Sequence, residues 1–176
     1  MKGSVVFGFL FLMSFSVNAQ INRNIGGVIL GETTKEEVKS HLLEKRNFYE
    51  DKDDGNAIQS VNEISFGGVL WSRVYYEFYK DILFRATFTK VVRGKENEIR
   101  SKYKELRENL YRKYMKRIPK DNSKDYSPKT QIKDKSSFIK LSITQDSRRP
   151  GTKYLKLTYL DTTMDAKKKK QGIDEL

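Results

Sequence analysis

Few side chains in this 176-residue sequence are suited to covalent chemistry. The chain contains no cysteine and a single histidine, His41, which leaves no thiol nucleophile and no metal site built from cysteine and histidine. The remaining acid–base option is a carboxylate pair. Glu63 and Glu77 both fall in apolar, strand-like segments, where different surroundings would push their pKa values apart. This pair keeps open a small secreted hydrolase that acts on a glycan or a peptide.

A second group of residues is suited to recognition rather than to catalysis. Tryptophan, tyrosine and arginine are enriched at the energetic centres of protein interfaces. Alternation along an extended strand places every second side chain on one side of a sheet. We therefore expect one partner-binding sheet face made of Trp71, Arg73, Tyr75, Tyr79 and Arg85. The alternative is that these residues pack beneath a loop or form half of a two-sided core.

The first 19 residues are typical of an export signal. Lys2 precedes an apolar run over residues 5–17 that is too short to span a bilayer, and Val17 and Ala19 suit a signal peptidase. We expect cleavage after Ala19 and a periplasmic or secreted mature chain with no further transmembrane segment. An uncleaved anchor is the alternative. We expect no cofactor and no metal in the mature protein.

The strong basic charge suggests different partners for a cytosolic and for an exported protein. The formal net charge is +12 at pH 7, which in a cytosolic protein would suggest nucleic-acid binding. For an exported protein the available partners are an envelope or extracellular protein, or an anionic glycan or lipid surface. The alternative is that the lysines only maintain solubility.

Hydrophobic periodicity predicts two helices, each followed by three strands. Thr34 and Glu37 form a capping-box pattern that begins a helix over residues 34–46. An apolar stripe with 3.6-residue periodicity predicts a second helix that ends before Pro119; its members are Ile99, Tyr103, Leu106, Leu110 and Tyr114. Alternating segments predict strands at 58–66, 69–79, 82–91, 130–134, 137–145 and 153–160. Gly67-Gly68 predicts a hairpin turn, and residues 51–56 a solvated loop.

These elements predict an α+β fold. We expect two tandem units, each a helix plus a three-stranded antiparallel meander, with both helices packed on one face of an antiparallel sheet. Residues 20–161 would form a single domain, with halves at about 30–92 and 95–161. Residues 162–176, which contain the lysine run 167–170, are expected to be a flexible tail.

The approach to the first helix resembles a motif of small exported bacterial envelope proteins, the SmpA/OmlA and beta-lactamase-inhibitor-protein-like group. The residues that carry the resemblance are Gly31, Thr34, Val38 and Leu42. The segment 64–71 leading into aromatic strands looks like other small exported proteins, and the tandem helix-plus-sheet order is similar to the beta-lactamase inhibitor proteins. The resemblance covers residues 26–90. It implies protein binding or envelope assembly rather than catalysis, and it brings no catalytic residues.

Overall fold

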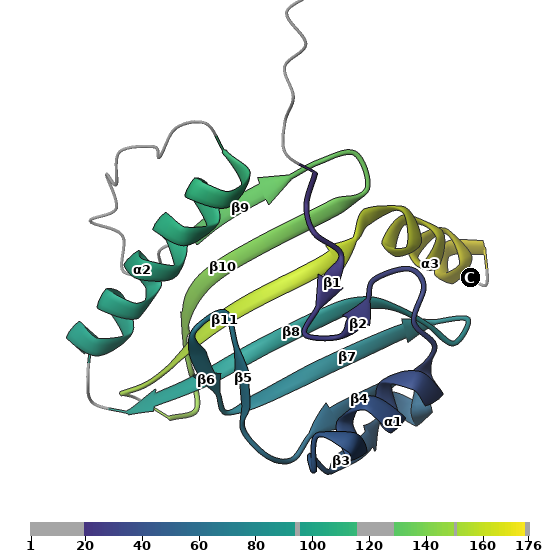
Figure 1. The fold of residues 1–176 in the computed structure, drawn as a ribbon, viewed down its shortest axis with the longest axis horizontal. Helices are drawn as coiled ribbons and strands as arrows, with labels where there is room; N and C mark the ends of the chain where they lie inside the picture. Colours follow the sequence, from purple (N-terminus) through teal and green to yellow (C-terminus); the bar gives the residue numbers. More distant parts are fainter. Residues whose placement is uncertain (1–19, 94–95, 116–128, 150, 175–176) are drawn as a thin grey trace, which may run out of the picture.

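The chain is an α+β protein built around a large antiparallel sheet (Figure 1). The computed structural model describes residues 20–93, 96–115, 129–149 and 151–174, so the predicted export signal and Pro119 lie outside the described residues. The helices are α1 (Lys35–Glu44), α2 (Glu96–Tyr114) and α3 (Thr162–Asp174), and η1 (Asp53–Gly55) is a 3₁₀ turn. The strands are β1 (Asn24–Ile25), β2 (Val28–Ile29), β3 (Tyr49–Lys52), β4 (Ala57–Ser60), β5 (Ile64–Phe66), β6 (Val69–Trp71), β7 (Arg73–Tyr79), β8 (Ile82–Arg93), β9 (Lys129–Lys133), β10 (Ser137–Gln145) and β11 (Thr152–Asp161).

Seven strands form the main sheet, in the order β3-β4-β7-β8-β11-β10-β9. Strands from both halves of the chain meet at its centre, where β8 pairs with β11. The hairpins β1-β2 and β5-β6 form separate two-stranded sheets. Both halves of the chain therefore contribute strands to the main sheet, whose two sides differ in what covers them.

One side of the main sheet, the covered face, packs against α1, α2 and the two hairpins (Figure 1). Its side chains are apolar and include Ile58, Val74, Tyr76, Ala86, Phe88, Leu141 and Leu157. The other side, the open face, carries the alternate residues of the same strands. They include Gln59, Arg73, Tyr75, Glu77, Arg85, Thr87, Lys140, Lys156 and Thr158.

The first helix begins as its sequence predicts. The backbone N–H of Glu37 donates to the Thr34 hydroxyl at 3.3 Å, and the Glu37 carboxylate accepts from the Thr34 N–H at 2.7 Å. These contacts lower the pKa of Glu37 below its ordinary value, the Thr34 backbone N–H being the main cause. The completed capping box fixes the end of α1 from which Val38 and Leu42 reach the core.

Replacing Thr34 by alanine is expected to lower the free energy of unfolding by about 1 kcal/mol, because one N-terminal N–H of α1 loses its acceptor. Urea unfolding followed by circular dichroism measures this change. Ser40→Ala, at an exposed position of the same helix, is the matched control and should change stability by less than about 0.5 kcal/mol. Equal losses in both variants would show that the capping box does not stabilise α1.

The second half of the chain confirms the predicted order. The apolar stripe of the second helix is buried in α2. The three expected strands are β9, β10 and β11, which pair as an antiparallel meander.

The first half differs from the predicted three-stranded meander. The expected strand at 58–66 forms two strands in different sheets, since β4 pairs with β7 and β5 pairs with β6. Residues 49–52, partly assigned to a solvated loop, add β3 at the edge of the main sheet. The segment before α1 forms the β1-β2 hairpin, which places Ile21 and Ile25 in the core.

The prediction of a tail without secondary structure is also corrected. Residues 162–174 form α3, which begins where the Asp161 carboxylate accepts from the Met164 N–H at 2.9 Å. The helix packs on the open face, opposite α1 and α2, because Asp165 pairs with Arg85 at 2.7 Å and the Lys168 ammonium lies 4.9 Å from the ring centre of Phe84.

Candidate functional site

The candidate site is the part of the open face that α3 does not cover. Its side chains are arranged in rows across the strands, because residues paired in register lie side by side on the same face. Arg73 on β7 is opposite Thr89 on β8, which is opposite Lys156 on β11. The next row contains Tyr75, Thr87 and Thr158. Strands distant in sequence thus bring their basic side chains onto one surface.

Trp71 does not belong to this surface. Its side chain is 0% exposed, lies 5.7 Å from the ring of Phe88 on the covered face, and donates its indole N–H to the Phe66 carbonyl at 2.9 Å. The predicted strand 69–79 bends at Ser72, so β6 and β7 belong to different sheets and the alternation changes phase. The prediction that Trp71 shares a face with Arg73 is therefore wrong, and Trp71 is a core residue.

Arg85 lies on the open face but is already paired. It donates to both carboxylate oxygens of Glu77 at 3.0 and 3.1 Å and to Asp165 of α3 at 2.7 Å. These contacts use its guanidinium to attach α3 to the sheet. We therefore assign Arg85 a structural role in place of the predicted partner contact.

The two carboxylates of the hydrolase alternative do not lie together. Glu77 is on the open face with Arg85. Glu63 precedes β5 and lines a pocket on the covered face. The two carboxylates lie on opposite sides of the sheet, so they do not converge on one substrate.

Two tyrosines predicted for the site do lie on the open face and are half-buried. The Tyr75 hydroxyl donates to the Asp53 carboxylate, and burial followed by this hydrogen bond raises the pKa of Tyr75 well above its ordinary value. Tyr79 lies beneath the ammonium of Lys80, 5.6 Å from its ring centre. Tyr75, one row along β7 from Arg73, is therefore available as a flat contact surface next to the basic residues, whereas Tyr79 lies at the opposite end of β7.

A group of basic side chains, called here the basic cluster, lies at the end of the open face away from α3. Its members are Arg73, Arg93, Arg149 and Lys156. They line two adjoining shallow grooves of about 430 and 620 Å³ that share Arg73, Arg149 and Tyr154. Within the described ranges, none of the four has a carboxylate in ion-pair contact.

One acid, Asp146, lines the same groove as Arg73, Arg149 and Lys156, and its hydrogen bonds are made to other groups. The Asp146 carboxylate accepts from the Tyr154 hydroxyl at 2.7 Å and from the Arg148 N–H at 2.9 Å. The Tyr154 hydrogen bond is the main cause of a pKa of Asp146 below its ordinary value. The carboxylate thus stays ionised and fixes the Tyr154 ring, over which Lys156 lies at 5.7 Å.

The sequence prediction identified one member of the basic cluster and missed three. Arg73 is exposed on β7 as expected. Arg93 is at the end of β8, Lys156 is on β11, and Arg149 is in the turn between β10 and β11. Pairing of β8 with β11 brings them together, and no local pattern reports that pairing. The sequence does carry one local sign of the cluster, the adjacent Arg148 and Arg149 between the expected strands 137–145 and 153–160.

Among the residues that the structure describes, no group of three or more histidine, aspartate and glutamate side chains could hold a metal ion. The described helices include none that is both long and apolar enough to cross a membrane. What the open face offers is positive charge, hydrogen-bond donors and tyrosine rings.

Comparisons with known proteins add no family or structural relative to this description. No protein-family model, curated protein or solved structure matches the chain significantly. The resemblance to the SmpA/OmlA and beta-lactamase-inhibitor-protein-like group therefore stays a prediction of the sequence. The structure does supply a physical reason for its glycine: Gly31 has φ +77°, and a Cβ there would lie 2.6 Å from Asp161 Oδ2.

Proposed function

We propose that the protein is an exported, non-enzymatic binding module that recognises the acidic surface of an envelope or extracellular protein through the open face. The observation that carries the proposal is the basic cluster: four cationic side chains that converge on shallow grooves and form no ion pair within the described ranges. A charged surface of this kind increases the rate of encounter with a partner of opposite charge and selects against basic partners.

The shape of the open face favours a protein over a small substrate. The grooves at the basic cluster are shallow and adjoin Tyr75 and the threonine rows of the sheet. A broad surface of arginine and tyrosine side chains is typical of protein interfaces. The hydrolase alternative has no comparable support, because Glu63 and Glu77 are on opposite sides of the sheet.

The proposal is tested by reversing charge at the two arginines that both grooves share. The mature chain from residue 20 is used to capture a protein from the envelope fraction of the producing bacterium, and the captured protein is then purified for affinity measurements. Arg73→Glu with Arg149→Glu should weaken its binding at least about tenfold, because four units of charge change at the contact. Binding by the unaltered chain should also weaken as ionic strength rises.

The matched control carries the same change of charge elsewhere. Lys104 on α2 and Lys135 in the β9-β10 turn are exposed, and Lys104→Glu with Lys135→Glu should leave affinity within about twofold. Equal losses in the two double variants would indicate a net-charge effect and overturn the assigned surface. Binding of anionic phospholipid vesicles or a sulfated glycan in preference to the captured protein would replace the protein partner with a lipid or glycan surface.

A further inference from the structure

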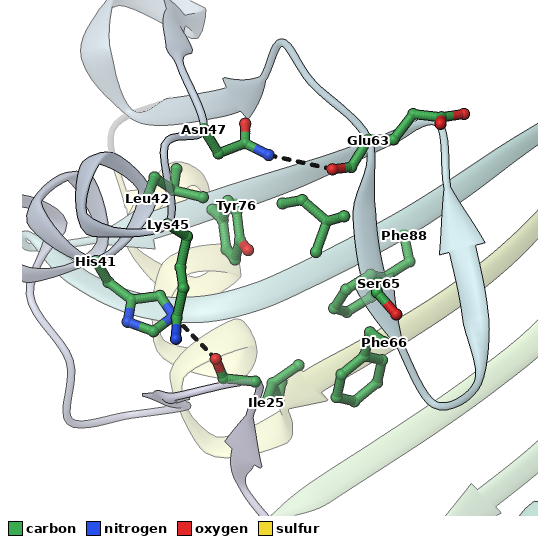
Figure 2. Close-up of a pocket in the computed structure, with 12 residues that line it drawn as sticks. Ile25, His41, Leu42, Lys45, Asn47, Glu63, Ser65, Phe66, Tyr76 and Phe88 are labelled. Atoms are coloured by element: carbon green, nitrogen blue, oxygen red, sulfur yellow. Dashed lines mark hydrogen bonds between the residues drawn. The ribbon is translucent and has the colours of Figure 1, made fainter.

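A pocket on the covered face, on the other side of the sheet from the basic cluster, has a different chemistry. It has a volume of about 400 Å³ and lies between α1, the β1-β2 hairpin and the β5-β6 hairpin, with β7 and β8 beneath it (Figure 2). Most of its wall is apolar and consists of Ile25, Leu42, Ile64, Phe66, Tyr76 and Phe88. This volume and apolar character are those of pockets that hold small molecules.

The Tyr76 hydroxyl is the first observation that points to a ligand. Tyr76 is 4% exposed, and Figure 2 shows its hydroxyl directed into the space between α1 and the β5-β6 hairpin. Within the part of the chain that the structure describes, this hydroxyl has no hydrogen-bond partner. Burial alone raises the pKa of Tyr76 well above its ordinary value. The hydroxyl is therefore a free donor that a bound acceptor in the pocket can use.

The distribution of charge around the pocket is the second observation. Lys45, at the end of α1, is exposed and has no ion-pair partner in the described ranges. Figure 2 shows Lys45 and His41 on the α1 side of Tyr76, Phe66 and Phe88 on the opposite side, and the Glu63 carboxylate directed away from the pocket. The site therefore has a cationic end and an aromatic end, with a hydrogen-bond donor between them.

His41 has a structural role at the cationic end. Its Nε2 lies 2.9 Å from the Gly26 carbonyl, so this nitrogen carries the proton and donates to the β1-β2 hairpin. The ring also fills the space beside Gly27, where a Cβ would lie 2.4 Å from it. Lys45 is thus the cation left to meet a ligand, and His41 holds the wall of the pocket in place.

We infer that this pocket binds a small amphiphilic carboxylate of the fatty-acid type. The carboxylate accepts a hydrogen bond from the Tyr76 hydroxyl and lies beside the Lys45 ammonium. The hydrocarbon chain extends along Phe66 and Phe88 beneath the β5-β6 hairpin. Burial of the chain supplies most of the affinity, and the two polar groups select the headgroup and its orientation.

The test compares ligands that share one tail and differ in headgroup. Decanoate, decanol and decyltrimethylammonium are titrated by calorimetry below the concentrations at which they form micelles. Decanoate is expected to bind at one site and at least about fivefold more tightly than decanol, with the cationic amphiphile weakest because of Lys45. Equal affinity for all three would show binding by the hydrocarbon chain alone, and no decanoate binding would exclude the site. Either result overturns the inference.

Substitutions assign the polar contacts. Tyr76→Phe removes only the hydroxyl and should weaken decanoate binding about three- to tenfold. It should leave the urea midpoint of the free protein unchanged or raised, because the hydroxyl has no partner to lose; a lowered midpoint would show a structural role instead. Lys45→Gln should weaken binding of decanoate about threefold and leave that of decanol unchanged. Lys104→Gln, remote on α2, is the charge-matched control for Lys45→Gln.

The outcome is independent of the proposed function. The charge-reversed variant at Arg73 and Arg149 alters the opposite side of the sheet, so its decanoate affinity should equal that of the unaltered chain. Loss of decanoate binding in that variant would show that decanoate binds at the basic cluster and not in the pocket.

Discussion

Replacing Trp71 by alanine is expected to lower the free energy of unfolding by about 3–5 kcal/mol, the usual cost of removing a large aromatic side chain from a core. The indole is 0% exposed and packs at 5.7 Å from Phe88, so the substitution leaves a cavity between the β5-β6 hairpin and β8. It also removes the donor to the Phe66 carbonyl. A domain of this size is stable by only about 5–15 kcal/mol. Chemical unfolding followed by far-ultraviolet circular dichroism measures the loss.

The adjacent residue provides a sharp control. Leu70 is 48% exposed and lies on the other side of the same strand, so Leu70→Ala should cost less than about 1 kcal/mol. Which of the two substitutions lowers the free energy of unfolding more shows directly which side of β6 faces the core. Uninterrupted alternation over 69–79 would instead place Leu70 with Val74 in the core and Trp71 outside. A larger loss for Leu70→Ala than for Trp71→Ala would therefore contradict the bend at Ser72.

The bend shows why a periodic pattern predicts strands better than faces. A shift of one residue moves every later side chain to the opposite side of a sheet. The shift here depends on two hydroxyls that replace backbone acceptors: Ser60 accepts from the Val74 N–H at 2.8 Å, and Ser72 accepts from the Val91 N–H at 3.1 Å. Both contacts join residues at least 14 positions apart. Both sides of the run 69–79 carry large apolar or aromatic side chains, so alternation alone does not reveal the change of phase at Ser72.

Features that depend on short-range contacts were predicted correctly. The capping box joins Thr34 and Glu37, the stripe of α2 repeats within one helix, and Gly67-Gly68 forms the turn between β5 and β6. The three strands of the second half follow one another in sequence and in the sheet. Each of these features is determined by residues close in the chain, whose patterns are readable without knowledge of the tertiary structure.

The two candidate sites depend on pairing between strands that are distant in sequence, so sequence patterns could not predict which residues meet there. The basic cluster requires β8 beside β11, and the pocket requires the β5-β6 hairpin over β7 and β8. The C-terminal helix is a different case, because Asp161-Thr162-Thr163 is a recognisable helix-start signal. The lysine run that follows it suggested a solvated tail, whereas in α3 those lysines project from a helix attached to the sheet through Asp165.

Asp161 is expected to be the most sensitive charged residue among those described, with Asp161→Ala lowering the free energy of unfolding by about 3 kcal/mol. Its side chain is 5% exposed and forms an ion pair with Arg23, whose Nε also donates to the Leu30 carbonyl at 2.8 Å. The other oxygen caps α3 through the Met164 N–H. The substitution thus leaves a guanidinium unpaired and removes a cap of about 1 kcal/mol. Thermal and urea unfolding measure the total.

Two further variants separate these contributions. Asp161→Asn keeps an oxygen able to cap α3 but removes the charge that Arg23 needs, so it should lose about two-thirds of what alanine loses. Glu32→Ala removes an exposed carboxylate from the turn before α1 and should change stability by less than about 0.5 kcal/mol. Hydrogen exchange adds a local measure, since loss of the cap should speed exchange in α3 more than in α2. Uniform exchange across both helices would mean that Asp161 acts through the ion pair with Arg23 alone.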